Sequence, residues 1–161
     1  INRAVESEAK LIAEKVVQSL RGVGVFGIEM FLEGNELLIN EIAPRPHNSG
    51  HYSIEACSIS QFEEHIRAIL GLPLTKPRLM TPAVMKNILG IPNYVGTYSF
   101  KGIDKALSIP GLKLHFYGKK FTKPQRKLGH FTITAEKIEE ALSRAKTVGN
   151  LLRVVKQRGS K

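Results

Sequence analysis

Several residue types and patterns are scarce in this sequence, and each scarcity argues against a class of protein. Its 161 residues include one cysteine, Cys57, so the chain cannot form an internal disulfide, and we expect a reducing, cytoplasmic compartment. No apolar run approaches the roughly 18 residues that a membrane-spanning helix needs, and no secretory signal is visible. Tryptophan is absent and aromatic residues make up 7% of the chain, which leaves few side chains to stack on nucleic-acid bases.

Charge is distributed unevenly along the chain. Residues 1–70 contain six Lys and Arg against ten Asp and Glu, whereas residues 71–161 contain eighteen against four, which gives net formal charges of −4 and +14. A basic segment of this kind can bind nucleic acid, attract a phosphorylated small molecule or remain a solvated face. Because no zinc finger or RNP motif accompanies the charge, we do not favour a nucleic-acid partner.

Apolar periodicity predicts helices and a hairpin in the first half of the chain. Helical spacing predicts a first helix from Ala4 to Leu20. Alternating runs on either side of Gly34-Asn35 predict a hairpin with strands Val25–Leu32 and Glu36–Ile42. A second helix is expected to begin after Ser60 and to end at Gly71, and its apolar face comprises Phe62, Ile66, Ile69 and Leu70.

The second half reads as a linker followed by a small sheet. Prolines at positions 73, 77 and 82 are typical of a linker. We expect the elements that follow to be strands within 83–90, 113–119 and 128–135, a helix from Glu136 to Leu152 and a loose tail over 156–161. The fold class is therefore predicted as α+β. Two domains are expected: residues 1–75, and a small basic β-rich module over residues 76–161.

Glu29 is unusual because it interrupts the apolar strand "GIEMF", where a charge is costly unless it is paired or binds a metal. With a three-residue turn after Glu33, Glu29 would face Glu41 across the hairpin at about 4.5–5.5 Å. Carboxylates placed so repel each other unless a cation lies between them, and Mg²⁺ takes oxygen ligands. The alternative is a salt-bridged Glu29 and an exposed Glu41. Asn40 would point to the other face of the hairpin.

The loop "APRPHNSGH", residues 43–51, is stiff and rich in hydrogen-bond donors. Pro44 and Pro46 restrict its backbone, and Arg45 between them suits bidentate contact with phosphate or carboxylate. The residues after them offer donors or allow close approach of a ligand: His47, Asn48, Ser49, Gly50 and His51. Two histidines would also allow zinc, but no further Cys or His stands at ligand spacing.

These stretches together are similar to a known family. The run "GVFGIEMF" and the later "LLINEIAPRPHNSGHYSIEACSISQFEEHIRAILGLPL" closely resemble the end of the ATP-grasp domain in 5-(carboxyamino)imidazole ribonucleotide synthases. Those enzymes are the ATP-dependent component of phosphoribosylaminoimidazole carboxylase. The segment "HFYGKKFTKPQRKLGHFTIT" is similar to their C-terminal module, which carries a Y-x-K…R-K-x-G-H pattern. The resemblance runs from about residue 22 to residue 134.

The resemblance implies an ATP-dependent carbon–nitrogen ligase of purine biosynthesis. In that family ATP and bicarbonate form carboxyphosphate, which carboxylates 5-aminoimidazole ribonucleotide. Matching residues imply that Glu29 and Glu41 hold magnesium and that Asn40 with Glu41 contacts ATP. The resemblance assigns catalysis to Arg45, His47 and Asn48, and substrate binding to Ser49, His51, Lys119, Arg126 and Lys127.

Two departures from the family pattern are visible. Ala43 stands where many ATP-grasp enzymes have a third metal ligand, an asparagine, and the spacing from Lys119 to Arg126 is one residue longer than usual. The resemblance also implies a preceding Rossmann-like domain and the first part of the ATP-grasp domain. We therefore expect this chain to be a C-terminal fragment that is inactive alone, and the complete protein to be a homodimer.

Two alternatives remain open. The ATP-grasp formate-dependent glycinamide ribonucleotide transformylase has a similar loop, "SPRPHDTG", whereas this chain has "APRPHNSGH", which favours the carboxylase. A non-catalytic basic module that binds nucleotides or nucleic acid would show steeply salt-dependent binding to oligonucleotides.

Overall fold

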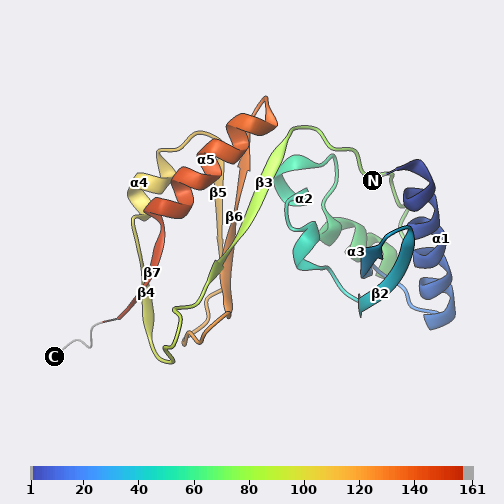
Figure 1. The fold of residues 1–161 in the computed structure, drawn as a ribbon, viewed down its shortest axis with the longest axis horizontal. Helices are drawn as coiled ribbons and strands as arrows, with labels where there is room; N and C mark the ends of the chain where they lie inside the picture. Colours follow the sequence, from blue (N-terminus) through green and yellow to red (C-terminus); the bar gives the residue numbers. More distant parts are fainter. Residues whose placement is uncertain (1, 158–161) are drawn as a thin grey trace. The chain divides into compact units, whose positions relative to one another are not determined.

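The structure, a computed structural model, describes residues 2–157 of the chain. The chain divides after Arg78 into two compact units, here called the N-terminal unit and the C-terminal unit. Both units combine helices with antiparallel strands, which confirms the predicted α+β class (Figure 1). Among the described residues, no helix has the length and apolar character needed to cross a membrane.

The N-terminal unit begins with helix α1, Arg3–Leu20, which starts one residue earlier than predicted. The side-chain oxygen of Asn2 caps it by accepting a hydrogen bond from the backbone N–H of Val5 at 2.9 Å. Arg21 ends the helix in the left-handed conformation, with φ of 48°. The apolar stripe of α1 faces the hairpin that follows, and Val5 is buried there.

The predicted antiparallel hairpin consists of strands β1, Gly27–Glu33, and β2, Glu36–Ala43. Its turn contains two residues, Gly34 and Asn35, and Gly34 has the positive φ, 60°, that such a tight turn requires. The expected three-residue turn is therefore wrong, because Glu33 pairs with the residue that directly follows Asn35.

Two short helical segments that the sequence patterns did not predict lie between β2 and the predicted second helix. They are η1, Asn48–Gly50, and α2, Ser53–Ala56. Helix α3, Gln61–Ile69, follows them. Ser60 caps α3 as predicted, since its hydroxyl accepts a hydrogen bond from the backbone N–H of Glu63 at 3.1 Å.

The C-terminal unit is built on an antiparallel sheet with strand order β3-β6-β5. Its strands, close to the three predicted segments, are β3 (Ala83–Leu89), β5 (Leu112–Phe116) and β6 (Lys127–Thr134). Helix α5, Ile138–Leu151, and the short helix α4, Ile103–Leu107, cover one face of this sheet (Figure 1). Helix α5 is the predicted final helix, shortened at both ends, whereas α4 was not predicted.

The core of the C-terminal unit lies between β6 and α5. Phe131 and Ile133 of β6 are buried against the small residues Ala141 and Ala145 of α5 and against Val148. Alanine at these helix positions lets the helix approach the sheet closely, because its side chain fills little space. This packing makes the sheet and α5 one continuous apolar core.

A second sheet joins two strands that are distant in sequence. Strand β4, Tyr98–Lys101, pairs with β7, Arg153–Lys156, and neither was predicted. The backbone N–H of Gln157 donates to the carbonyl of Thr97 at 3.2 Å. The expected loose tail is therefore wrong for its first two residues, and its remainder, residues 158–161, lies outside the described residues.

Candidate functional site

A β-bulge brings Glu29 and Glu41 opposite each other. Given the two-residue turn, uninterrupted pairing would place Glu29 opposite Asn40. The register instead shifts by one residue between Glu29 and Met30, so that Glu29 pairs with Glu41. The predicted opposition of the two glutamates is confirmed, but a bulge in β2 produces it rather than the length of the turn.

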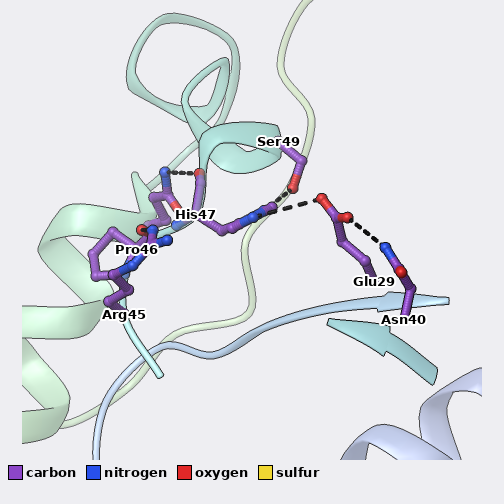
Figure 2. Close-up of polar contacts among 7 residues, drawn as sticks. Glu29, Asn40, Arg45, Pro46, His47 and Ser49 are labelled. Carbon is purple, nitrogen blue, oxygen red and sulfur yellow. Dashed lines mark hydrogen bonds and ion pairs between the residues drawn. The ribbon is translucent and has the colours of Figure 1, made fainter. Parts of the chain in front are cut away.

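The bulge also determines where Asn40 lies. Its side-chain Nδ2 donates a hydrogen bond to Oε2 of Glu29 at 3.3 Å (Figure 2). The expectation that Asn40 points to the other face is wrong, because an extra residue interrupts the alternation of side chains along a strand. Glu29, Asn40 and Glu41 therefore present their polar groups on one face of the hairpin.

The two carboxylates have different surroundings. Glu29 receives the Asn40 hydrogen bond and lies near His47, whose Nε2 is 3.5 Å from its Oε1. Glu41 is exposed, and its side chain forms no hydrogen bond or ion pair among the described residues. Two carboxylates on one face fit Mg²⁺, a hard cation that takes carboxylate oxygens and fills its other positions with water or phosphate oxygens. The described part of the chain holds no cluster of three His, Cys, Asp or Glu ligands, so this pair would supply two positions.

Gly27 allows His47 to approach strand β1. A Cβ at residue 27 would lie 2.5 Å from the Cβ of His47, which is too close for two carbon atoms. The His47 side chain is 12% exposed, and its Nδ1 lies 2.8 Å from the hydroxyl of Ser49 (Figure 2). When that hydroxyl donates to Nδ1, the imidazole proton is on Nε2 and is directed toward Glu29.

Gln61 and Ser53 hold the loop, and sequence reasoning did not single them out. The Gln61 side chain accepts from the N–H of His47 and donates to its carbonyl, both at 2.8 Å. Its Nε2 also lies 2.9 Å from Nδ1 of His51. Buried Ser53 donates to the Gly50 carbonyl at 2.6 Å and accepts from the Gln61 N–H at 2.9 Å. Both residues open helices, where polar side chains commonly turn back to the preceding loop, and that signal could have found them.

The other residues expected in catalysis lie elsewhere on the loop. Nη1 of Arg45 donates to the carbonyl of Pro46 at 3.1 Å, and the side chain is exposed. In the view of Figure 2, His47 lies between Arg45 and Glu29. Asn48 begins the short segment η1. The structure thus brings His47 to the carboxylate pair but turns the guanidinium of Arg45 toward the loop backbone.

A cavity of about 440 Å³ opens beside the loop within the N-terminal unit, and His47 and Ser49 are part of its wall. Cys57 also lines it, and burial raises the pKa of this thiol, so it stays protonated at neutral pH. Glu64 lines the cavity as well. Hydrogen bonds from the side chain and backbone of Thr75 lower the pKa of Glu64, which keeps its carboxylate ionised.

Five basic residues of the C-terminal unit lie close together in sequence between the end of β5 and the first residue of β6. This basic segment contains Lys119, Lys120, Lys123, Arg126 and Lys127. Nζ of Lys119 is 5.9 Å from the ring centroid of Tyr117, and Nη1 of Arg126 donates to the carbonyl of Phe121 at 3.2 Å. Within the described chain none of the five cations forms an ion pair with an acidic side chain. Their charge is therefore available to an anion.

Tyr117, two residues before this segment, is anchored through its hydroxyl. The Oη atom lies 2.8 Å from Nδ1 of His130, which is 2% exposed. The His130 ring stacks on that of His115 with 4.4 Å between ring centroids. Burial raises the pKa of Tyr117, so the phenol stays protonated at neutral pH and can donate to His130.

Comparisons with known proteins agree with this arrangement. Residues 1–62 match the family model of the ATP-grasp domain, and residues 83–144 match that of the phosphoribosylaminoimidazole carboxylase C-terminal domain. The chain is 47% identical to phosphoribosylaminoimidazole carboxylase of Saccharomyces cerevisiae, over 88% of this chain and 25% of that protein.

Solved structures agree as well. The N5-carboxyaminoimidazole ribonucleotide synthetase of Thermotoga maritima has a TM-score of 0.86 and 54% identity, over 98% of this chain and 44% of that one. The N5-carboxyaminoimidazole synthase of Aspergillus clavatus, in complex with ADP and 5-aminoimidazole ribonucleotide, has a TM-score of 0.78 and 39% identity, over 93% and 40%. The chain spans between 25% and 44% of the length of these relatives. It belongs to the N5-carboxyaminoimidazole ribonucleotide synthase family of ATP-grasp enzymes.

Proposed function

We propose that this chain contributes residues to an enzyme that carboxylates 5-aminoimidazole ribonucleotide in purine biosynthesis. In the proposed reaction a bicarbonate oxygen attacks the γ-phosphorus of ATP, which forms carboxyphosphate and releases ADP. Carboxyphosphate then delivers its carboxyl group to the amine of the ribonucleotide and releases phosphate. The observation that carries the proposal is the bulge that places Glu29 opposite Glu41 beside Asn40 and His47.

In this proposal Glu29 and Glu41 hold Mg²⁺, and Asn40 with Glu41 contacts ATP. Glu29 and Glu41 would hold the ion, whose charge would offset the negative charge of the ATP phosphates. Asn40 orients the Glu29 carboxylate through its hydrogen bond, while exposed Glu41 is open to a cation. Catalysis of phosphoryl transfer rests largely on such positioning and charge neutralisation.

Arg45, His47 and Asn48 are the proposed catalytic residues for bicarbonate and the phosphoryl group. Among the described residues the Arg45 guanidinium donates to a single acceptor, the Pro46 carbonyl, so most of its donors remain for an oxyanion. His47 lies beside Glu29, and the Gln61 side chain hydrogen-bonds both its backbone N–H and its carbonyl.

Ser49, His51 and the basic segment are proposed to bind the ribonucleotide. Lys119, Arg126 and Lys127 would surround its 5′-phosphate, for which clustered cations without acidic partners are suited. The Aspergillus clavatus relative was solved with ADP and 5-aminoimidazole ribonucleotide, which supports both a nucleotide and this substrate.

The wider assignments are part of the same proposal. We assign residues 1–75 to an ATP-grasp domain and residues 76–161 to a C-terminal module, and the matches to two different family models support this assignment. The resemblance further implies that the remaining part of the ATP-grasp site comes from a longer protein, that this protein is a homodimer and that this chain alone is inactive. The single cysteine supports a cytoplasmic location.

The transformylase is the weaker alternative. The model that matches residues 83–144 is that of a carboxylase C-terminal domain, and the loop reads "APRPHNSGH". A non-catalytic nucleic-acid module is weaker still, because the basic segment belongs to that same carboxylase domain.

The test uses a complete ATP-grasp enzyme that carries this sequence, with Glu29→Gln and Glu41→Gln as variants. Each should lower bicarbonate-dependent ADP formation by at least about 100-fold, the loss expected when one electrostatic contact to the reacting group is removed. Glu33→Gln is the matched control, because Glu33 and Glu36 also oppose each other on this hairpin but lie at its turn. Near-normal rates for both site variants would refute the metal assignment.

A further inference from the structure

We propose that Gln61 is a positioning residue that sets the tautomer of His51, in which the imidazole proton is on Nε2 and Nδ1 is unprotonated. The tautomer itself follows from hydrogen bonds within the N-terminal unit. The consequence for the substrate rests on the proposed function.

The orientation of the Gln61 amide is determined by backbone groups. Its Oε1 lies 2.8 Å from the backbone N–H of His47, which can only donate, so this atom must be the oxygen. Its Nε2 lies 2.8 Å from the His47 carbonyl, which can only accept, so this atom must be the nitrogen. A flipped amide would break both hydrogen bonds.

The same nitrogen determines the state of His51. The amide group of Gln61 carries two hydrogens on Nε2, and one of them is used by the His47 carbonyl. Nδ1 of His51 lies 2.9 Å from this Nε2, within reach of the second hydrogen. Because Nε2 has no lone pair to accept with, Nδ1 must be the acceptor, and the proton of neutral His51 is on its own Nε2.

Packing around Gln61 keeps this arrangement in place. A Cβ at residue 50 would lie 2.6 Å from Oε1 of Gln61, so glycine there leaves room for the amide. The hydroxyl of Ser53 holds the Gln61 backbone N–H at 2.9 Å. The ring of His51 also stacks on Phe62 at 5.5 Å between centroids, so neighbouring residues of α3 fix its plane and its Nδ1.

The arrangement gives His51 a defined chemical role. Because the Gln61 nitrogen cannot accept, a proton on Nδ1 would find no acceptor there, so the donor of neutral His51 is its Nε2–H. In the proposed reaction such a group can hydrogen-bond an oxygen of the phosphorylated substrate, but its Nδ1 cannot act as a general base while Gln61 occupies it.

Long-range ¹H–¹⁵N NMR of the 161-residue chain, with its histidines labelled with ¹⁵N, tests the tautomer directly. At pH 7.5 His51, assigned by the loss of its signals in His51→Asn, should show a protonated Nε2 and an unprotonated Nδ1. In Gln61→Glu a carboxylate faces Nδ1, so the proton of the neutral ring should move to that nitrogen, which leaves Nε2 without a hydrogen to donate. Gln18→Glu, an exposed position on α1, should leave the His51 signals unchanged.

Two results would overturn the proposal: a wild-type His51 with its proton on Nδ1, or Gln61→Glu with His51 still neutral and protonated only on Nε2. The wild-type spectrum is decisive even if Gln61→Glu does not fold. Gln61→Met, which keeps the shape but removes the donor, should give a mixture of both tautomers, and a single Nε2–H form in that variant would also count against it.

Kinetics of a complete enzyme that carries this sequence separates this inference from the proposed function. Gln61→Glu should raise KM for the ribonucleotide by about tenfold, equivalent to one lost hydrogen bond, and leave KM for ATP within about twofold. Equal changes in both constants would indicate a general structural role and would refute the positioning role. If the wild-type enzyme instead forms no ADP with bicarbonate, the proposed function fails while the tautomer remains tested by NMR.

Discussion

The N-terminal and C-terminal units differ in how they are held together. Among the described residues the C-terminal unit buries ten apolar side chains, whereas the N-terminal unit buries four. Phe131 of β6 is 2% exposed, but Phe31 of β1 is 61% exposed. Since buried apolar area is the main favourable term in folding, we expect the C-terminal unit to be the more stable of the two.

This difference shows that something other than apolar packing holds the candidate site in place. The apolar face predicted for the second helix remains largely exposed, with Phe62 at 40% and Ile66 at 50%. The loop next to this helix is nevertheless held by at least five hydrogen bonds that involve Gln61 and Ser53. In the N-terminal unit specific polar contacts position the site, whereas in the C-terminal unit packing positions a sheet from which the basic segment extends.

The largest expected effect comes from a pair of matched substitutions that could break this comparison. Phe131→Ala should lower the free energy of unfolding of its unit by about 3–5 kcal/mol, because it opens a cavity in a closed core. Phe31→Ala should change stability by about 0.5 kcal/mol or less, since its side chain is mostly in solvent. Urea unfolding followed by circular dichroism measures both values. Similar losses for the two variants would show that the units do not differ in this way.

A smaller effect distinguishes the chemistry of the two units. In a complete enzyme that carries this sequence, Lys119→Ala should raise KM for the ribonucleotide about 10-fold or more, because a hydrogen bond to a charged phosphate is lost. KM for ATP should change far less, since the ATP-contacting pair is assigned to β2. Lys113→Ala removes an exposed charge from β5 outside the basic segment and is the control. Equal effects on both Michaelis constants would contradict the phosphate role.

The smallest effect concerns alkaline stability. Burial raises the pKa of Tyr117 in the folded chain above its ordinary value of about 10, so the unfolded chain releases this proton first. The stability that this group contributes is fully present below the unfolded-state pKa of about 10, and it is lost as the pH rises through the higher folded-state pKa. Tyr117→Phe should cost about 1 kcal/mol at neutral pH for the lost hydrogen bond to His130, and should flatten the alkaline fall. Tyr52→Phe, at an exposed tyrosine of the N-terminal unit, should leave the fall unchanged in urea titrations between pH 8 and about pH 11.

Local patterns predicted most of the long elements but not the short or distant ones. Helix α1, the hairpin and the capped helix α3 each carry a periodic apolar pattern with a recognisable start or turn. Helices α2 and α4 have four and five residues, too few for a period to show. Strands β4 and β7 pair across more than fifty intervening residues, so no local signal indicates that pairing.

The site was predicted in part, and one correct result had the wrong cause. Glu29 was expected opposite Glu41 because of a three-residue turn, whereas the structure has a two-residue turn and a bulge at Asn40. The wrong turn length and the missed bulge cancelled for the glutamates. They did not cancel for Asn40, which lies on the same face as Glu29. Bulges depend on how a strand packs and twists, and a single strand's sequence does not show them.

The sequence by itself determined the residue types of the site, the uneven charge and the family, since these depend on composition and on continuous motifs. The tertiary structure alone decided which of those residues meet. It placed His47 against Glu29 through Gly27, turned Arg45 to the Pro46 carbonyl and made Gln61 the partner of both loop histidines. The physical reason is that hydrogen bonds and close packing join atoms by position in space, which chain order constrains only locally.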